Sequence, residues 1–336
     1  MVIIMIIDKL IERAKNDKKT ICLVETDDIR TLKAASIVNE KDFANIILVG
    51  DESSINKLSK ENNINLDNIK IINPNTSELT QELIDKYYEI RKHKGLTYEE
   101  AENTIKNNYL YFGDMLVYLD YADGLVAGAT HPSSDVLRAA LKTVKTAVDA
   151  KIVSAFFLME LENKNLGSDG VFIFSDCGMI QNPTSEQLVD IAYSSIKTFE
   201  NLVGDTPKIA FLSHSTNGSS NCSDVDKVKN AVKLFKDNYP NIIADGEMQL
   251  DTAIVPSIQQ SKFPDSSIKG DANILIFPDL DAGNIGYKLV ERFGNAKAYG
   301  PITQGMKKPI NDLSRGCNEQ DIVGAIAITC LQAQKN

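Results

Sequence analysis

Short apolar runs rich in β-branched residues alternate with longer amphipathic segments along the chain, and this alternation limits the possible folds more than any other feature. Brief β-branched runs are typical of buried strands, and longer segments with an apolar stripe are typical of helices. The expected strands are 20–25, 45–49, 70–72, 124–127, 153–158, 170–174, 208–212, 273–277 and 296–299. The expected helices are 4–16, 29–39, 79–93, 98–106, 133–148, 185–203, 224–238, 282–293 and 319–333. The pattern predicts an α/β protein whose largely parallel sheets are covered by helices on both faces.

The chain has 336 residues, which exceeds one typical domain and predicts two doubly wound α/β domains with a ligand-binding cleft between them. The last predicted helix, 319–333, has an apolar face that must be buried, while the middle of the chain already forms a closed run of strands and helices. We therefore expect the C-terminus to return to the first domain. The predicted domains are 1–146 plus 299–336, and an inserted domain at 147–298.

The formal net charge of −10 argues against nucleic acid or an anionic membrane as a partner, because either requires a broad basic face. A small anionic ligand remains compatible if a few cations are concentrated locally. Lysine supplies most of the 36 basic residues, so each guanidinium is a candidate for phosphate or carboxylate binding. The arginines are Arg13, Arg30, Arg91, Arg138, Arg292 and Arg315.

Cysteine usage and the apolar runs predict a cytoplasmic protein. The five cysteines are widely spaced and contain no C-x-x-C pair, which indicates neither a disulfide framework nor a zinc site. The apolar N-terminal run 2–7 is short and has no basic region before it, so it does not read as a signal peptide. No apolar stretch approaches the length of a membrane span.

Several common cofactor signatures are missing from the sequence. No G-x-G-x-x-G follows the first predicted strand, which argues against a dinucleotide site. The segment 300–308 superficially suggests a phosphate loop, but Met306 separates Gly305 from Lys307 and no Ser or Thr follows. The three histidines are far apart in sequence and have no acidic pair beside them, so no metal site is predicted.

Turns rich in small and hydroxyl residues follow several predicted strands. The turn 128–135 opens a helix that carries Arg138, and free N–H groups at a helix start favour phosphate binding. The simpler interpretation is an ordinary N-cap by Ser133 or Ser134. Similar turns occur at 213–220 and 279–287, and ligands of open α/β sheets gather at such carboxyl ends of strands.

The segment 300–317 is a longer connection, punctuated by glycine and proline, than a compact domain normally uses between a strand and a helix. It places Ser314, Arg315 and Gly316 side by side, with Asp321 six residues beyond Arg315. Long ordered loops are often functional, so this segment is a candidate site.

The sequence closely resembles the phosphate acetyltransferase (phosphotransacetylase) family. The resemblance is carried by DGLVAGATHPSSDVLRAAL at 123–141, GVFIFSDCGMIQNPTSEQLVDIA at 170–192, DGEMQLDTAIVPSI at 245–258 and the region 272–327 with GPITQGMKKPINDLSRGC. These segments follow the family's order over nearly the whole chain. The resemblance implies reversible transfer of an acetyl group between coenzyme A and phosphate, in a homodimer with a fold like that of isocitrate and isopropylmalate dehydrogenases.

The resemblance also implies functional residues. Ser314, Arg315 and Asp321 correspond to the family's active-site groups, and Arg91 and Arg138 to arginines implicated in substrate binding. The strand-to-helix turns add further candidate substrate contacts, namely Thr130, Ser133, Gly283, Asn284, Gly286 and Tyr287. CoA, acetyl-CoA, phosphate and acetyl phosphate are the implied small-molecule substrates, and neither a metal nor a permanently bound cofactor is implied.

The expected chemistry gives each of the three active-site residues a distinct role. CoA attacks as its thiolate, which is scarce at pH 7, so we expect Asp321 to act as the base in a partly desolvated site. Arg315 would hold the phosphoryl group and Ser314 would donate to the developing oxyanion. For Asp321 the simpler role is to favour the dipole of the last helix. Cys317 could be an acyl carrier, but a small buried filler is the favoured interpretation.

Three alternatives remain open at this point. A phosphate butyryltransferase or another phosphate acyltransferase would share fold and mechanism and differ in pocket volume. A metal- and NAD-dependent decarboxylating dehydrogenase would need an aspartate cluster and a cofactor loop, neither of which is found in the sequence. A non-catalytic protein that binds CoA or acetyl phosphate would not need Ser314, Arg315 and Asp321 together.

Overall fold

The computed structural model describes residues 5–334, so residues 2–4 of the apolar N-terminal run and the first residue of the helix expected at 4–16 lie outside the described part. The chain forms two compact units, one of residues 1–148 with 306–336 and one of residues 149–305. The second boundary lies at 305 rather than at the expected 298, because the strand that ends at Gln304 pairs with a strand of the second unit.

The first unit contains a parallel sheet of five strands in the order β11-β4-β1-β2-β3. Its strands are β1 (Thr20–Leu23), β2 (Asn45–Val49), β3 (Lys70–Ile72), β4 (Gly124–Val126) and β11 (Ile310–Asn311). Its helices are α1 (Ile6–Ala14), α2 (Ile29–Lys41), α3 (Glu52–Glu61), α4 (Thr80–Arg91), α5 (Tyr98–Asn107), α6 (Tyr109–Tyr118), α7 (Ser133–Thr143) and α13 (Glu319–Ala333).

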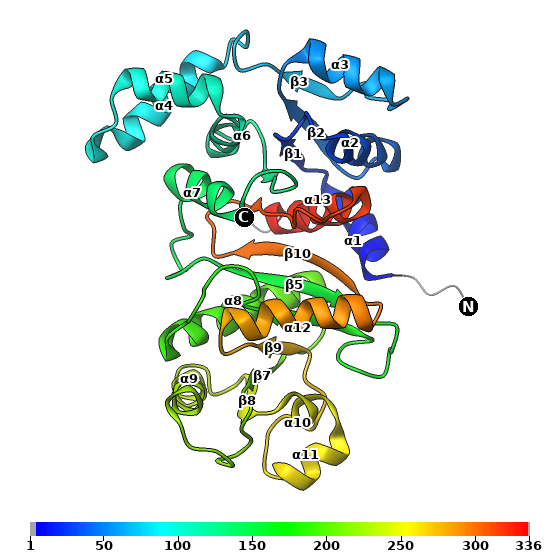
Figure 1. Ribbon diagram of the computed structural model, residues 1–336, viewed down its shortest axis with the longest axis vertical. Helices are drawn as coiled ribbons and strands as arrows, with labels where there is room; N and C mark the ends of the chain where they lie inside the picture. Colours follow the sequence, from blue (N-terminus) through cyan, green and yellow to red (C-terminus); the bar gives the residue numbers. More distant parts are fainter. Residues whose placement is uncertain (1–4, 335–336) are drawn as a thin grey trace. The chain divides into compact units, whose positions relative to one another are not determined.

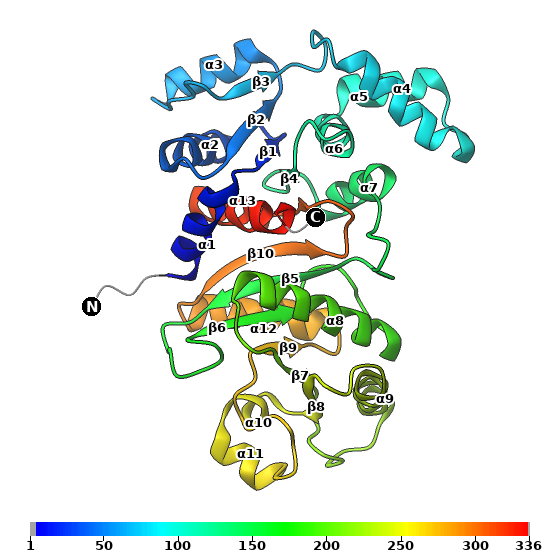
Figure 2. The ribbon, with the colours of Figure 1, turned by 180° about the vertical axis from the view of Figure 1, so that it is seen from behind.

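Helices cover both faces of this sheet (Figures 1 and 2). One face carries α1, α2 and α13, and the other carries α6 with α4, α5 and α7 around it. Helix α13 is buried nearly all around, from Ile322 to Leu331, which is more than the single apolar face expected from the sequence. Such an all-round apolar helix belongs in the interior of a unit.

The second unit contains a mixed sheet of six strands in the order β10-β5-β6-β9-β7-β8. Its strands are β5 (Ser154–Glu160), β6 (Val171–Ser175), β7 (Lys208–Leu212), β8 (Ile243–Met248), β9 (Ile274–Ile276) and β10 (Lys297–Gln304). Strand β5 pairs antiparallel with β10 and β6, and the remaining pairs are parallel. Its helices are α8 (Ser185–Leu202), α9 (Ser223–Asn238), α10 (Leu250–Ile254), α11 (Pro256–Lys262) and α12 (Leu280–Phe293).

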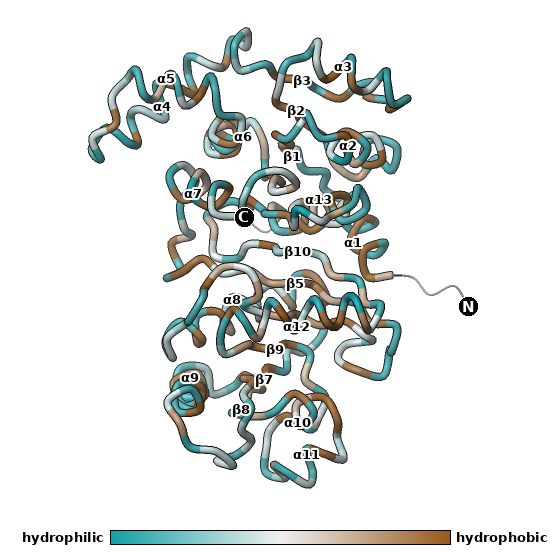
Figure 3. Tube along the Cα trace, in the orientation of Figure 1, coloured by the Kyte–Doolittle hydropathy of each residue, from teal (hydrophilic) through white to brown (hydrophobic). Residues whose placement is uncertain are grey.

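Helices α8 and α12 lie on opposite faces of this second sheet, since α12 is in front in Figure 1 and α8 is in front in Figure 2. The hydropathy of α12 alternates along its length in Figure 3, as expected of an amphipathic helix. Its Tyr287 packs into a core of Phe157, Met248 and Leu275. Both units therefore have the predicted α/β architecture.

The sequence pattern missed helices α3, α6, α10 and α11 and strands β8 and β11. Strand β8 contains Asp245 and Glu247 and therefore lacks an apolar run, and β11 has only two residues. Strand β10 was expected at 296–299, but it continues to Gln304 past Gly300 and Pro301 with a register shift between Tyr299 and Ile302. The long connection expected at 300–317 is therefore part strand β10, part strand β11 and part turn.

Candidate active site

Three turns meet at the carboxyl edge of the first unit's sheet, because β1, β4 and β11 are neighbouring parallel strands that end at the same level. Leu23 of β1 and Asn311 of β11 are both in register with Val126 of β4. The turns that follow these strands begin at Val24, Ala127 and Asp312. The edge therefore joins the turn predicted at 128–135 with the Ser314–Arg315 segment.

Glu25 organises the turn after β4. Its carboxylate accepts hydrogen bonds from the backbone N–H groups of Ala129 (2.7 Å), Thr130 (2.9 Å) and His131 (2.8 Å). It also contacts the Thr130 hydroxyl at 3.0 Å and His131 Nδ1 at 2.8 Å. Burial opposes ionisation of Glu25, but these hydrogen bonds, led by that of His131, outweigh it and lower its pKa to about 2.

This arrangement changes the expected anion site at the turn. The N–H groups of residues 129–131 and the Thr130 hydroxyl donate to Glu25, so within the turn predicted at 128–135 these donors are already engaged. The start of α7 differs from its simpler interpretation as well. Pro132 occupies the N-cap, Ser133 is the first helical residue, and no side chain caps the helix. The available backbone donors therefore lie at the α7 start rather than in the turn.

Arg30, from the helix after the β1 turn, links the Ser314–Arg315 segment to the turn after β4 through hydrogen bonds. Its Nη1 donates to the carbonyl oxygens of Arg315 (2.9 Å) and Cys317 (2.8 Å), and its Nη2 donates to that of Ala129 (2.8 Å). Asp28, the N-cap of α2, orients the guanidinium through a 2.6 Å contact with Nη2. A planar guanidinium can serve all these acceptors at once.

Ser314 and Arg315 are exposed on a tight turn. The Cys317 N–H donates to the Ser314 carbonyl at 2.9 Å, which closes the turn. The side chains of Ser314 and Arg315 are both exposed, so they are accessible to a ligand. Arg30 thus holds the backbone of this turn through hydrogen bonds, while the side chains of Ser314 and Arg315 remain accessible to a ligand.

Asp321 lies in the first turn of α13, where it takes part in a capping box. The Asn318 N–H donates to Asp321 Oδ2 at 2.9 Å, and Asn318 Oδ1 accepts from the Asp321 N–H at 3.1 Å. A hydrogen bond from a backbone N–H favours the ionised carboxylate. The capping role that the sequence offered as the simpler interpretation is therefore present, and Asp321 is half-buried rather than sequestered.

Cys317 is buried beneath this turn, with 7% of its surface exposed. Burial raises the pKa of its thiol to about 11, and the charge of Arg30 only partly opposes this. A thiol that stays protonated at neutral pH is a poor nucleophile. The contacts thus match the filler interpretation rather than an acyl carrier.

Arg91 and Arg138 lie elsewhere in the first unit. Arg91 ends α4, and Arg138 on α7 pairs with Asp135 at 2.6 Å on the surface. Burial raises the pKa of the Tyr111 hydroxyl, and the charges of both arginines act against that rise. Both guanidinium groups are therefore near enough to Tyr111 to act on its hydroxyl through their charge.

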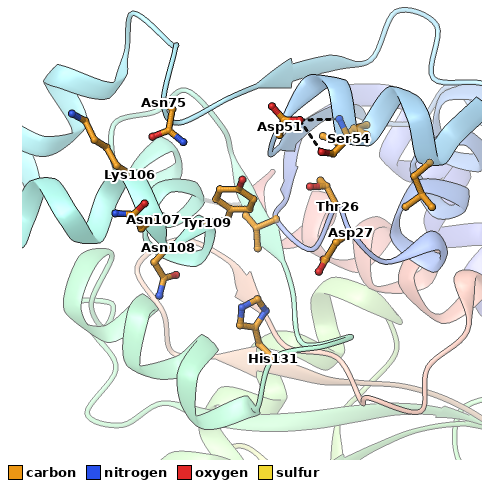
Figure 4. A pocket seen from close by; sticks show the side chains of 13 residues that line it. Thr26, Asp27, Asp51, Ser54, Asn75, Lys106, Asn107, Asn108, Tyr109 and His131 are labelled. Carbon is orange, nitrogen blue, oxygen red and sulfur yellow. Dashed lines mark hydrogen bonds between the residues drawn. The ribbon is translucent and has the colours of Figure 1, made fainter.

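A cavity of about 650 Å³, lined by polar and apolar side chains, lies beside the turns after β1 and β4. Thr26 and Asp27 reach it from the turn after β1 and His131 from the turn after β4, facing Asn108 and Tyr109 at the start of α6 (Figure 4). Since His131 also contacts Glu25, the cavity adjoins the same group of turns. A small polar ligand would fit this volume.

The remaining predicted contacts lie in the second unit, at the start of α12. A Cβ on Gly283 would stand 2.4 Å from the Asp176 carbonyl, so only glycine lets the helix approach there. The Asn284 amide donates to the Cys177 carbonyl at 3.1 Å. Gly286 faces the Phe277 ring, and Tyr287 is buried and stacked on Phe157. These contacts give all four residues a packing role, whether or not they also touch a ligand.

Glu25 and Asp312 belong to this group of turns and were not selected from the sequence, and Arg30 was named there only as one of six candidate guanidinium groups. Glu25 and Arg30 are visible as an acid directly after a buried strand and as one of few arginines. Asp312 is 3% exposed, and its Oδ1 has no hydrogen-bond partner among the described residues. The only sequence feature that could have drawn attention to Asp312 is its position two residues before Ser314.

Among residues 5–334, no helix combines the length and the apolar character that a membrane crossing needs. Within this part of the chain, no three His, Cys, Asp or Glu side chains are grouped as metal ligands would be.

Comparison with known proteins shows what the chain is similar to. The family described as phosphate acetyl/butaryl transferase matches residues 5–330. A phosphate acetyltransferase of Acetivibrio thermocellus is 48% identical over 328 residues, which cover 98% of each chain. The crystal structure of a phosphotransacetylase from Streptococcus pyogenes covers 100% of both chains with a TM-score of 0.92 and 36% identity.

A more distant likeness concerns the fold alone. The 4-hydroxythreonine-4-phosphate dehydrogenase of Klebsiella pneumoniae covers 94% of this chain and 100% of its own, with a TM-score of 0.54 and 13% identity. This agrees with the dehydrogenase-like fold expected from the sequence. From the full-length family match and the relative at 48% identity, the chain belongs to the phosphate acetyl/butaryl transferase family and is an acyltransferase.

Proposed function

We propose that the protein is a phosphate acetyltransferase that interconverts acetyl-CoA plus phosphate and acetyl phosphate plus CoA. The observation that carries this proposal is the Ser314–Arg315 turn, which presents a hydroxyl and a guanidinium to solvent on a backbone fixed by Arg30. A fixed donor set of this kind suits a phosphoryl or acyl oxygen, since preorganised donors stabilise developing negative charge. The names of the similar proteins support the same reaction.

In the direction of acetyl-CoA formation, the CoA thiolate attacks the carbonyl carbon of acetyl phosphate. A C–S bond forms, the C–O bond to phosphate breaks, and phosphate leaves. We assign the base that accepts the thiol proton to Asp321, the oxyanion donor to Ser314 and the phosphoryl contact to Arg315. Arg91, Arg138 and Ser133 are proposed substrate contacts in the first unit, where the α7 start lacks a side-chain cap.

The contacts of the other proposed substrate residues restrict what they can offer. Thr130 donates its hydroxyl proton to Glu25, so only its oxygen can face a ligand. Gly283, Asn284, Gly286 and Tyr287 would act mainly through backbone groups and ring surface, because their packing contacts fix them within the second unit. Substitution of Asn284 by alanine would raise KM for CoA if this proposal holds.

The decisive experiment follows the free thiol released from acetyl-CoA in the presence of phosphate. Phosphate-dependent release, with acetyl phosphate as the second product, supports the proposal. Thiol release that does not depend on phosphate would instead indicate a hydrolase. Acyl preference is measured in the same assay with acetyl-, propionyl- and butyryl-CoA, since one methylene is worth about 1–3 kcal/mol. A larger kcat/KM with butyryl-CoA would favour a phosphate butyryltransferase.

A homodimer is proposed as the assembly state, with α12 as part of its interface. Ile285, Leu289 and Phe293 recur every fourth residue along α12 and are exposed, with Phe293 at 86%. A stripe of large apolar residues on one helix face suits an isologous contact. Leu289→Asp should shift the mass measured by light scattering to that of a monomer, whereas Gln260→Asp on α11 should not. A wild-type monomer would refute the proposal.

The cellular location is proposed to be cytoplasmic. All five cysteines are free thiols in the structure, four of them buried, as expected of a reducing compartment. Fractionation of the cells that produce the protein, followed by immunodetection, tests this location directly.

A further inference from the structure

Asp312 is a buried carboxyl at the centre of the three turns, and the proposed reaction does not use it. It follows β11 directly and precedes Ser314 by two residues. It is 3% exposed, and its Oδ1 lacks a hydrogen-bond partner within residues 5–334. A buried carboxylate with an unsatisfied oxygen is costly in its ionised form, because neither water nor a donor replaces its hydration.

The space around Oδ1 is made by a glycine. Gly128 has a φ of +105°, and a Cβ there would stand 2.2 Å from Asp312 Oδ1 and 2.6 Å from the Leu313 nitrogen. The carboxyl group is therefore pressed between the turn after β4 and the turn that carries Ser314.

The charged groups around Asp312 favour its neutral form. Burial is the largest effect and raises its pKa to about 7, although the Ser133 hydroxyl and the Leu313 N–H oppose the rise. The Glu25 carboxylate raises the pKa further, and Arg315 lowers it. His131, the other titratable group of the turn after β4, pairs with Glu25. The pKa values of these two neighbouring carboxyls thus differ widely, and below neutral pH Glu25 is ionised while Asp312 is protonated.

We propose that Asp312 is a positioning residue that acts in its protonated form, and that its ionisation draws Arg315 away from the substrate anion. This rests on the proposed function, in which Arg315 binds the phosphoryl group. When Asp312 loses its proton to solvent, Arg315 is the cation three residues away that can compensate the buried charge. Conversely, an anion held by Arg315 makes ionisation of Asp312 harder. Anion binding and protonation of Asp312 are therefore coupled, and coupling is reciprocal.

The test compares wild type with Asp312→Asn, a neutral side chain of nearly the same shape, from pH 5.5 to 9. The ratio of kcat/KM between variant and wild type cancels the titration of CoA, of phosphate and of Asp321. We expect the variant to be within about threefold of wild type at pH 6, and the ratio to rise about tenfold between pH 6 and 8.5. Asp67→Asn, the same change at an exposed position, should give a flat ratio. A flat ratio for Asp312→Asn, or a folded but inactive variant at pH 6, would overturn the proposal.

A second measurement keeps the test independent of turnover and of the folding of the variant. Sulfate keeps its charge over this pH range, unlike phosphate, and serves as a probe of the Arg315 site by calorimetry. Wild-type affinity for sulfate should weaken about tenfold from pH 6 to 8.5 and become weak at every pH in Arg315→Lys. Affinity that depends on Arg315 but not on pH would refute the role of Asp312. Absence of acetyl transfer with the expected pH-dependent sulfate binding would refute the proposed function alone.

Discussion

Replacing Glu25 by glutamine should destabilise the first unit by about 3 kcal/mol at neutral pH. The hydrogen bonds give one measure, because a bond to a charged group is worth about 1.5–3 kcal/mol and the glutamine amide would face the Ala129 N–H donor. The pKa gives another, since its lowering from 4.5 to about 2 corresponds to about 3 kcal/mol at about 1.4 kcal/mol per unit. The two measures agree in order of magnitude.

The pH dependence of this effect follows from two groups. Because the pKa of Glu25 is lowered on folding, its contribution is present above pH 4.5 and is lost as the pH falls towards 2. The pKa of His131 is raised from 6.5, chiefly by the same Glu25 hydrogen bond. Its contribution is therefore present below pH 6.5 and is lost as the pH rises through the folded value. Glu25→Gln removes both, so its cost should be largest at pH 5–6 and smaller at pH 8.

Thermal unfolding followed by calorimetry at pH 5.5 and 8 measures this cost. For a unit of about 150–250 residues, 1 kcal/mol shifts Tm by about 2–4 °C, so Glu25→Gln should lower Tm by about 6–12 °C at pH 5.5. Glu40→Gln, the same change at an exposed position of α2, is the control and should leave Tm nearly unchanged. A Tm loss below about 2 °C, or one that grows from pH 5.5 to 8, would refute the reasoning.

Two arginine substitutions test the Ser314–Arg315 turn. One removes the hydrogen bonds by which Arg30 holds its backbone, and the other changes the proposed phosphoryl contact of Arg315. Arg30→Lys keeps the charge but cannot reach the carbonyls of Ala129, Arg315 and Cys317 together. Its kcat/KM should therefore fall at least tenfold, with little change in fold as checked by circular dichroism. Unchanged kinetics would mean that the Ser314–Arg315 turn keeps its conformation without Arg30. Arg315→Lys should lower kcat/KM by about tenfold to a hundredfold, since one charge-assisted hydrogen bond is worth about 1.5–3 kcal/mol, and near-normal values would reduce Arg315 to a surface charge.

The alternation of apolar runs was sufficient to predict the α/β class and most elements, because buried parallel strands such as β2 and β7 are continuous apolar runs. It could not predict β8 or the end of β10, where polar residues and Gly300–Pro301 interrupt the pattern while the neighbouring strand still supplies hydrogen bonds. Tertiary pairing decides such segments, and local sequence does not encode it.

The site shows the same division between local and long-range information. Ser314, Arg315 and Asp321 are close in sequence, so a motif could identify them together. Glu25 and Arg30 act on residues about 100 and 285 positions away, through the register of three strands. The part of the turn 128–135 that is occupied by Glu25 could not be foreseen for this reason, because the N–H groups of Thr130 and His131 donate to an acid from a distant turn.

Asp321 remains the sharpest choice between a base and a helix cap, and the capping box now allows the two to be separated. In Asp321→Asn the new side chain can still accept from the Asn318 N–H, so a cap role predicts a stability loss of about 0.3–1 kcal/mol from the lost charge and nearly unchanged turnover. A base role predicts a loss of about 10²–10⁴-fold in turnover.

Asn318→Ala is the matched control, because it removes the cap at a cost of about 0.5–2 kcal/mol and leaves the carboxylate in place. If Asp321 is the base, only Asp321→Asn loses turnover, and the loss shrinks towards pH 8.5 as solvent supplies the CoA thiolate. Nearly unchanged turnover in Asp321→Asn, or a change no larger than that in Asn318→Ala, would assign Asp321 to the cap alone.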